Sequence, residues 1–193
     1  MIINEIFYSL QGEGFFTGTP SLFIRFSGCN LQCDFCDTQH QKGTKMTEEE
    51  IANQAALCPA KHVVITGGEP SLQLTDTLVE LLHQQGKFVA VETNGTHPLP
   101  SNVDWITLSP KSPFIHDKKA QVCLKKCNEL KVVYTGQSLL DFSYIKSDNY
   151  FLQPCETENA EQNETILEET IAYCLRHPQW RLSLQTHKLI GVR

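Results

Sequence analysis

The stretch Cys29-Asn30-Leu31-Gln32-Cys33-Asp34-Phe35-Cys36-Asp37-Thr38 places three cysteines in one short loop, with the spacing C-x3-C-x2-C. Zinc usually takes four ligands, and its cysteines tend to come as two C-x2-C pairs. Three thiolates in one loop suit a cubane iron–sulfur cluster instead, because they hold three of its irons and leave the fourth open for a small ligand. From the spacing alone, a zinc site with a distant fourth ligand and three cysteines without any metal stay open as alternatives.

The residues before this loop predict a strand. Apolar side chains alternate with others along residues 21–27, and the segment runs directly into Cys29. Arg25 lies on the less apolar face of this strand. If that face points into the interior of a barrel, the guanidinium needs an anionic partner.

Strand and helix patterns alternate along most of the remaining chain. Residues 4–20 are rich in turn-forming glycines and predict an irregular segment. We predict helices over residues 48–57, 72–85 and 163–176, and strands over residues 62–66, 87–92, 105–108, 130–134, 150–153 and 180–184. This alternation predicts a mostly parallel sheet of βαβ units. A complete (β/α)8 barrel takes about 250 residues, so we expect an α/β fold with an incomplete, (β/α)6-type partial TIM barrel, in one domain over residues 1–193.

Composition narrows the class of protein. Sixteen Lys and Arg against 22 Asp and Glu give a net charge of −6, which argues against a nucleic-acid partner held by a basic surface. No apolar stretch approaches the ~18 residues of a membrane span, and no signal peptide opens the chain. We therefore expect a cytoplasmic protein, where thiols stay reduced and eight cysteines favour cluster binding over disulfides. The cysteines outside the loop, to which we assign no role, are Cys58, Cys123, Cys127, Cys155 and Cys174.

A second motif, Gly67-Gly68-Glu69-Pro70, follows a short predicted strand. Paired glycines let the backbone turn and expose its carbonyl and amide groups, although a plain strand-to-helix turn would look the same. In this order, the cysteine loop and the G-G-E-P element resemble the radical S-adenosylmethionine (SAM) superfamily. The resemblance implies that the cysteines hold a 4Fe–4S cluster and that the G-G-E-P element meets the methionyl group of SAM.

Further elements narrow the resemblance. They are residues 9–14 (SLQGEG), residues 25–31 (RFSGCNL), Cys36-Asp37-Thr38, Glu92-Thr93-Asn94-Gly95, Ser109-Pro110-Lys111 and Gln185-Thr186-His187-Lys188. As a set spread over nearly the whole chain, they resemble the 7-carboxy-7-deazaguanine synthase family. The resemblance implies conversion of 6-carboxy-5,6,7,8-tetrahydropterin to 7-carboxy-7-deazaguanine with loss of ammonia, in queuosine and 7-deazapurine biosynthesis. It also implies cleavage of SAM by the reduced cluster, hydrogen abstraction from C6 of the pterin, and regeneration of SAM.

The resemblance assigns roles to single residues. Cys29, Cys33 and Cys36 would hold the 4Fe–4S cluster, and Thr38 would ligate a Mg2+ ion that also binds substrate. SAM would be bound by Phe35, Cys36, Asp37, Gly68, Ser109, Pro110, Lys111 and Gln153. The pterin would be bound by Leu10, Gln11, Gly12, Arg25, Thr66, Glu92, His187 and the terminal carboxylate of Arg193. A planar guanidinium such as that of Arg25 suits the substrate carboxylate.

Partners and rival functions complete the expectations. We expect a homodimer that takes electrons from a reductase or a flavodoxin-type donor, with no nucleic-acid or membrane partner. A radical SAM activase that makes a glycyl radical on a partner enzyme stays open, but it gives no reason for the Leu10–Gly14 element with Arg25 and Glu92. A non-enzymatic iron–sulfur electron carrier also stays open, but it would need neither the G-G-E-P element nor an open iron.

Overall fold

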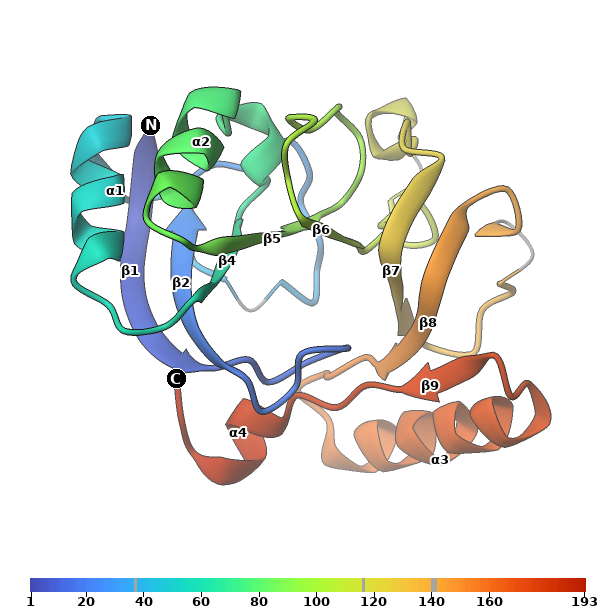
Figure 1. The fold of residues 1–193 in the computed structure, drawn as a ribbon. Coiled ribbons are helices and arrows are strands. Elements are labelled where there is room, and N and C mark those ends of the chain that lie inside the picture. Colours follow the sequence, from blue (N-terminus) through green and yellow to red (C-terminus); the bar gives the residue numbers. More distant parts are fainter. Residues whose placement is uncertain (37, 116, 140–141) are drawn as a thin grey trace.

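The computed structural model describes residues 1–193 except residues 37, 116 and 140–141 (Figure 1). Within these residues, nine strands form one sheet in the order β3-β1-β2-β4-β5-β6-β7-β8-β9. The strands are β1 (Ile2–Leu10), β2 (Pro20–Phe26), β3 (Thr44–Lys45), β4 (His62–Gly67), β5 (Phe88–Thr93), β6 (Trp105–Leu108), β7 (Lys126–Tyr134), β8 (Lys146–Pro154) and β9 (Trp180–Leu182). The helices are α1 (Glu48–Ala56), α2 (Asp76–Gln84), α3 (Ala160–Arg176) and α4 (Thr186–Ile190), with short 3-10 helices at Pro70–Leu72 and Lys118–Ala120.

The sheet is an open, mostly parallel barrel. Strands β2, β4, β5, β6, β7, β8 and β9 run parallel in that order, whereas β1 pairs antiparallel with both β2 and β3. Among the described residues, β3 and β9 are edge strands that do not pair with each other, so the barrel is incomplete, as predicted. In Figure 1, α1 and α2 cover one end of the curved sheet, and α3 covers β8 and β9 at the other.

The larger core lies between the sheet and the pair α1 and α2. The apolar face of β2, formed by Leu22, Ile24 and Phe26, is buried there against the helices. Burying each such side chain stabilises the fold by about 1.5–3 kcal/mol. The alternate face of β2 therefore points away from the helices into the lumen of the partial barrel, and Arg25 lies on it, level with Thr66 of β4.

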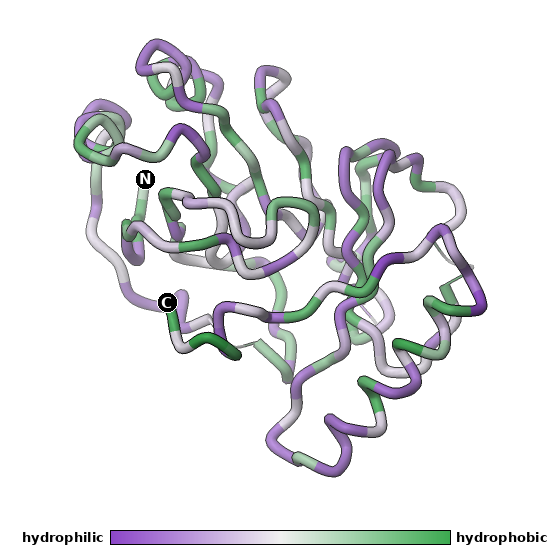
Figure 2. The backbone as a smooth tube through the Cα atoms, turned by 60° about the horizontal axis from the view of Figure 1, so that its bottom comes forward, coloured by the Kyte–Doolittle hydropathy of each residue, from purple (hydrophilic) through white to green (hydrophobic). Residues whose placement is uncertain are grey.

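Local signals explain the helix boundaries. Thr47 and Glu50 form the expected capping box of α1. The predicted helix over residues 72–85 begins later in the structure. A 3-10 turn ends at Leu72, and α2 starts only at Asp76. The reason is that the Thr75 side chain accepts a hydrogen bond from the backbone N–H of Leu78 and caps α2 there. In α3, apolar and polar residues alternate along the tube in Figure 2, as expected for a helix with one face on the sheet.

Two features differ from the expectations. Residues 4–10, the first part of the predicted irregular segment 4–20, belong to strand β1, because the backbone there pairs antiparallel with β2. In the described parts of residues 94–104, 109–125 and 135–145, the connections between β5 and β8 contain no α-helix. None of the helices in the described parts has the length and apolar character needed to cross a membrane.

Candidate active site

The parallel strands bring their C-terminal ends to one edge of the sheet, where active sites of such folds lie. At this edge, the G-G-E-P loop after β4 packs on the backbone that precedes the cysteine loop. The N–H of Gly68 donates to the Phe26 carbonyl over 2.9 Å, and the N–H of Glu69 donates to the Gly28 carbonyl over 2.8 Å. A Cβ atom on Gly68 would lie 2.0 Å from the Gly28 oxygen, so only glycine allows this approach beside Cys29.

Glu69 of the same motif braces the loop. Its side chain is 1% exposed, and its carboxylate accepts hydrogen bonds from the N–H of Ser71 (3.0 Å), the hydroxyl of Thr93 (2.6 Å) and the N–H of Asn94 (2.7 Å). The carboxylate therefore ties the G-G-E-P loop to the end of β5. This role of Glu69 was not predicted, because the G-G-E-P motif alone does not show whether its glutamate binds a ligand or holds the loop in place.

The three loop cysteines lie within electrostatic reach of one another. Burial is the main cause that raises the pKa of Cys29, and the neighbouring thiols of Cys33 and Cys36 raise it further. Burial also raises the pKa of Cys33, while the Lys111 ammonium opposes this effect. Among the described residues, no three His, Cys, Asp or Glu side chains stand close enough to hold a single metal ion. Three half-buried to exposed thiols at a strand end fit a cluster that spans the loop.

Three of the predicted SAM-binding residues meet beside this loop. The Phe35 ring packs edge-on against Phe114, with 4.7 Å between ring centres. The Lys111 ammonium lies 5.8 Å from the centre of the Phe35 ring and donates to the Ser109 hydroxyl over 2.6 Å. Burial lowers the pKa of Lys111, partly offset by the Cys33 thiol. This side of the site is therefore aromatic, with one partly buried cation.

Further predicted SAM-binding residues are Pro110, Gln153 and Asp37. Pro110 lies between Ser109 and Lys111 in the loop after β6. Gln153, near the end of β8, accepts a hydrogen bond from the Ser183 hydroxyl over 3.1 Å, so its carbonyl oxygen is already engaged within the protein. Asp37 lies outside the described residues.

In the lumen, three predicted pterin-binding residues meet at one carboxylate. The Gln11 amide donates to Glu92 Oε1 over 3.1 Å, and the Thr66 hydroxyl donates to Glu92 Oε2 over 3.0 Å. These residues come from the β1–β2 loop, β4 and β5. The sequence analysis predicted their common site from family resemblance, and the structure places them in direct contact.

A buried lysine that the sequence analysis did not single out completes this group. Lys131 of β7 is buried, and its ammonium lies 2.5 Å from Glu13 Oε2 and 3.6 Å from Glu92 Oε1. Burial opposes ionisation of Glu13, but Lys131, together with a hydrogen bond from Gln185, outweighs it and holds the pKa of Glu13 at about 2. The same carboxylates raise the pKa of Lys131 against the effect of burial. The signal that could have identified it was a lysine between the apolar residues Leu130 and Val132 of the predicted strand over residues 130–134.

Glu129 is a second acid that the sequence analysis missed. Burial raises its pKa, although Lys131 opposes this shift. Its Oε2 atom accepts a hydrogen bond from the N–H of Phe15 over 3.2 Å and a longer one from the Thr107 hydroxyl. Its Oε1 atom is buried without a hydrogen-bond partner among the described residues. The lumen thus holds three acids around one lysine.

Arg25 links the lumen to the cysteine loop. One of its terminal nitrogens donates to the Thr38 hydroxyl over 3.0 Å. Its Nε atom lies 2.9 Å from Glu5 Oε1, but the N–H does not point at that oxygen, so this contact is an ion pair rather than a hydrogen bond. The guanidinium also lies 5.6 Å from the centre of the Phe7 ring. The structure therefore joins Arg25 and Thr38, which the family resemblance assigned to one substrate and its Mg2+ ion.

The segment after β9 folds back on the segment after β1. The N–H of Thr186 donates to the Gly12 carbonyl over 3.0 Å, and a Cβ on Gly12 would lie 2.0 Å from His187 Nδ1. His187 therefore packs directly on Gly12. Leu10, which is half-buried, lies two residues before Gly12 in the chain. This contact brings together predicted pterin-binding residues from the two ends of the chain.

The last residue reaches β1. The Arg193 guanidinium pairs with Glu5, and its backbone oxygen accepts a hydrogen bond from the Ser9 hydroxyl over 2.6 Å. In Figure 1 the C-terminus accordingly lies beside the end of β1. Arg193 and Arg25 thus share Glu5 as an anionic partner.

Comparison with known proteins agrees with this geometry. The family model for the radical SAM superfamily matches residues 23–132, more than half of the chain. The chain is therefore a radical SAM enzyme, and its cofactors are a 4Fe–4S cluster and SAM.

Relatives define the family more closely. A 7-carboxy-7-deazaguanine synthase of Bacteroides thetaiotaomicron is 52% identical over 99% of this chain and 98% of its own length. One of Bordetella pertussis is 40% identical over 98% of each chain. The crystal structure of QueE from Escherichia coli superposes with a TM-score of 0.73 at 30% identity, covering 96% of this chain and 94% of that one. This chain belongs to the 7-carboxy-7-deazaguanine synthase family of radical SAM enzymes.

Proposed function

We propose that the lumen of this enzyme binds 6-carboxy-5,6,7,8-tetrahydropterin and converts it to 7-carboxy-7-deazaguanine with loss of ammonia, as a step in queuosine biosynthesis. The observation that carries this proposal is the hydrogen bond from Arg25 to the hydroxyl of Thr38, two residues after Cys36. A guanidinium can bind a carboxylate through two parallel hydrogen bonds, and a threonine hydroxyl is an acceptable ligand for Mg2+. In our proposal, the substrate carboxylate is held by Arg25 and by Mg2+ at Thr38.

The inner end of the pterin faces the acid group of the lumen. The Glu92 carboxylate lies 3.6 Å from the Lys131 ammonium, and its oxygens can accept hydrogen bonds from the N–H groups of a pterin. Gln11 and Thr66 already donate to this carboxylate and fix its rotamer. On the open side, we propose that Leu10, Gly12, His187 and the Arg193 carboxylate close over the ring.

SAM lies on the other side of the pterin, against the cysteine loop. We propose that Phe35, Cys36, Asp37, Gly68, Ser109, Pro110, Lys111 and Gln153 bind it, and that Cys29, Cys33 and Cys36 hold the cluster. When bound, the cluster and SAM supply the 5′-deoxyadenosyl radical that removes hydrogen from C6 of the substrate. The chain's own contribution is to orient C6 towards that radical and to exclude water from the lumen.

Three properties of the whole molecule belong to the same proposal. We propose one domain over residues 1–193, because one continuous sheet includes strands from both ends of the chain. A homodimer is supported by the exposed apolar side chains of Leu189 and Ile190 on α4. A cytoplasmic location and a flavodoxin-type donor are supported by the eight free cysteines and the need for a low-potential electron.

One experiment separates this function from its rivals. The anaerobically reconstituted protein receives SAM and excess dithionite, with and without the pterin, and the products are identified by mass spectrometry. Formation of 7-carboxy-7-deazaguanine only with the pterin supports the proposal. If SAM is cleaved without conversion of the pterin, a glycyl-radical activase is favoured. If SAM is not cleaved although the cluster is reduced, the chain is an electron carrier, and the proposal is wrong.

A further inference from the structure

Two arginines and one glutamate meet on the face of β1 and β2 that points into the lumen. Glu5 lies directly opposite Arg25 in the antiparallel pairing of β1 with β2, and its Oε1 atom is 2.9 Å from Arg25 Nε. The Oε2 atom of the same carboxylate pairs with the guanidinium of Arg193, from the segment after β9. The proposed function uses the carboxylate of Arg193, but it leaves the Arg193 side chain and Glu5 unexplained.

Both guanidiniums lie over one aromatic ring. Phe7 shares a face of β1 with Glu5, because side chains two positions apart in a strand point the same way. The centre of the Phe7 ring lies 4.9 Å from the Arg193 guanidinium and 5.6 Å from that of Arg25. Phe7 is itself stacked on Phe23 of β2, with 4.9 Å between ring centres. The aromatic pair and Glu5 therefore hold two like charges close together.

Glu5 also fixes which edge of Arg25 is offered to a ligand. It lies on the Nε side of the guanidinium, whereas a terminal nitrogen donates to the Thr38 hydroxyl over 3.0 Å. The side chains of Glu5 and Arg25 are only 23% and 24% exposed, so this arrangement is partly shielded from water. A carboxylate that meets Arg25 beside Thr38 is therefore bound by the two terminal nitrogens, away from Glu5.

The total charge of this group sets its attraction for a carboxylate. Arg25 paired with Glu5 alone is neutral, and a neutral pair attracts an anion only weakly. The guanidinium of Arg193 brings the total to +1, two cations against one anion, which matches the single negative charge of a carboxylate. The carboxylate of Arg193 acts at a different place, because the backbone oxygen of this residue accepts a hydrogen bond from Ser9, over 2.6 Å. Ser9 lies roughly 13 Å from Glu5 along β1.

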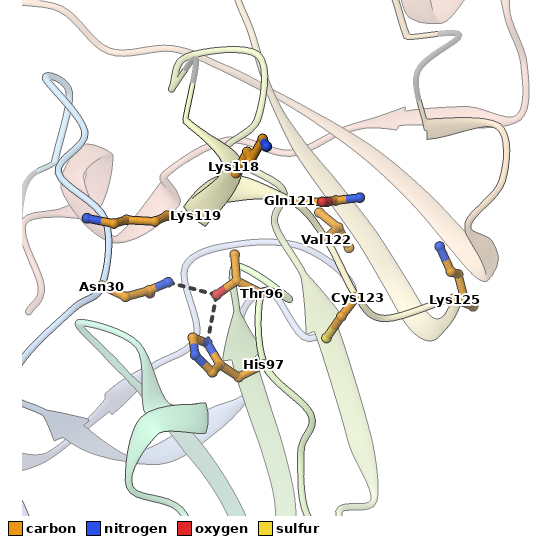
Figure 3. A pocket seen from close by; sticks show the side chains of 9 residues that line it. All are labelled: Asn30, Thr96, His97, Lys118, Lys119, Gln121, Val122, Cys123 and Lys125. Atoms are coloured by element: carbon orange, nitrogen blue, oxygen red, sulfur yellow. Dashed lines mark hydrogen bonds between the residues drawn. The ribbon is translucent and has the colours of Figure 1, made fainter.

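The other cations around the lumen serve other groups. Lys131 is paired with Glu13, and Lys111 donates to the Ser109 hydroxyl beside Phe35. A third set lines a separate pocket of about 540 Å³ (Figure 3), whose described lining includes neither arginine: Lys118, Lys119 and Lys125. Arg193 is thus the cation that Glu5 brings to Arg25.

We propose that the Arg193 side chain, held by Glu5 and Phe7, supplies the positive charge that Arg25 needs to bind the carboxylate of the pterin. The inference rests on the proposed function, since it takes Arg25 as the residue that meets this carboxylate. Glu5 is then a positioning residue, which anchors Arg193 and directs the terminal nitrogens of Arg25 towards Thr38. A pterin without the carboxylate does not use this charge, so the group selects carboxylated pterins.

The test follows the charge of the group through four proteins. They are the parent, Glu5→Gln, Arg193→Gln and the double variant Glu5→Gln/Arg193→Gln, in which the group carries +1, +2, 0 and +1 respectively. Each protein is loaded with its cluster and saturated with SAM, and all are compared at equal iron content without Mg2+. Anaerobic calorimetry measures binding of 6-carboxypterin, a stable oxidised pterin with the carboxylate, and of unsubstituted pterin. Arg176→Gln is the matched control, because Arg176 is exposed at the end of α3.

Binding of 6-carboxypterin is expected to follow the charge. Arg193→Gln should bind it about fivefold more weakly than the parent, the upper end for a partly exposed ion pair, and the difference should shrink at high salt. The double variant should return to within about twofold of the parent, because loss of the Glu5 carboxylate restores the total of +1. Glu5→Gln should bind at least as tightly as the parent, and Arg176→Gln should bind like it. Affinities for unsubstituted pterin and for SAM should be equal in all of these proteins.

The outcomes separate this charge from a structural role of the tail and from the proposed function. A purely structural role would leave the double variant at least as weak as Arg193→Gln, and that result would overturn the proposal. Parent-like binding by Arg193→Gln, or equal affinity of the parent for the two pterins, would overturn it as well. Conversion of the tetrahydropterin by the parent tests the proposed function by itself, whereas the order of affinities among the variants tests the charge of the group.

Discussion

Replacing Lys131 with methionine perturbs the buried charges of the lumen most directly. The Lys131 side chain is 7% exposed, and its ammonium is close to both Glu13 and Glu92. Removing one partner of a buried ion pair leaves an uncompensated charge and costs about 3–5 kcal/mol. In a chain of this size, each kcal/mol lowers the Tm by about 2–4 °C, so we expect a decrease of about 10 °C, measured by circular dichroism under anaerobic conditions.

The pH dependence of stability sharpens this prediction. In the parent, Lys131 holds the pKa of Glu13 at about 2, below its ordinary value of 4.5, so this carboxylate stabilises the fold above pH 4.5 and loses its contribution as the pH falls towards 2. Without Lys131, burial raises the folded pKa above the unfolded one, and stability is then lost as the pH rises between the two. We therefore expect the urea midpoint of Lys131→Met to decrease as the pH rises above about 4.5, and that of the parent to change less.

Lys126→Met is the matched control, since Lys126 lies on the same strand but is exposed. Both variants are compared with the parent at equal iron content. A decrease in Tm no larger than that of Lys126→Met, together with a parent-like pH profile, would refute the argument that Lys131 compensates buried acids.

Four further changes test the site. We expect most bound iron and SAM cleavage to be lost in each of Cys29→Ala, Cys33→Ala and Cys36→Ala. We expect a full cluster to remain when alanine replaces Cys58, Cys123, Cys127, Cys155 or Cys174. Iron content is measured in each variant, and loss of iron in any of the latter five would contradict the ligand assignment. Thr38→Ala is expected to weaken the rise of activity with Mg2+, and an unchanged Mg2+ titration would remove Thr38 from this role. Arg25→Lys keeps the charge but loses the planar fork, so we expect weaker pterin binding with SAM binding unchanged, by calorimetry; the reverse pattern would place Arg25 on the SAM side. Residues added after Arg193 are expected to raise the KM for the pterin far more than a tag before Met1, and equal KM values would exclude the tail from the site.

The sequence predicted the parts of the fold that depend on local patterns. The alternation along residues 21–27 predicted strand β2 and the face on which Arg25 lies, because a period of two needs no tertiary information. Residues 4–10 were not predicted as a strand because their pairing with β2 leaves no local pattern, and the apolar residues of β1 do not alternate cleanly. Helix α2 begins later than predicted because the Thr75 cap, not the leucine spacing, sets its first turn.

The site was predictable wherever a motif marks it. The residues Gln11, Thr66 and Glu92 were grouped from resemblance, and they are in contact. Glu13 and Lys131 were not grouped, because they are 118 positions apart and only the tertiary fold brings the β1–β2 loop into contact with β7. Periodicity describes neighbours along one element, so a pair formed across the lumen leaves no local pattern.

The G-G-E-P element shows why a functional motif can also be a packing motif. Gly68 is needed because the backbone before Cys29 occupies the space of a side chain. Glu69 is needed because two hydrogen bonds, from Thr93 and Asn94, hold it against the end of β5, and a third comes from Ser71 in its own loop. Both residues position the cysteine loop without reaching into the lumen. The first cluster ligand is therefore placed by contacts that the chain itself makes among β2, β4 and β5. Such contacts reduce the ordering that cluster and SAM binding require, and this preorganisation favours binding at the strand ends.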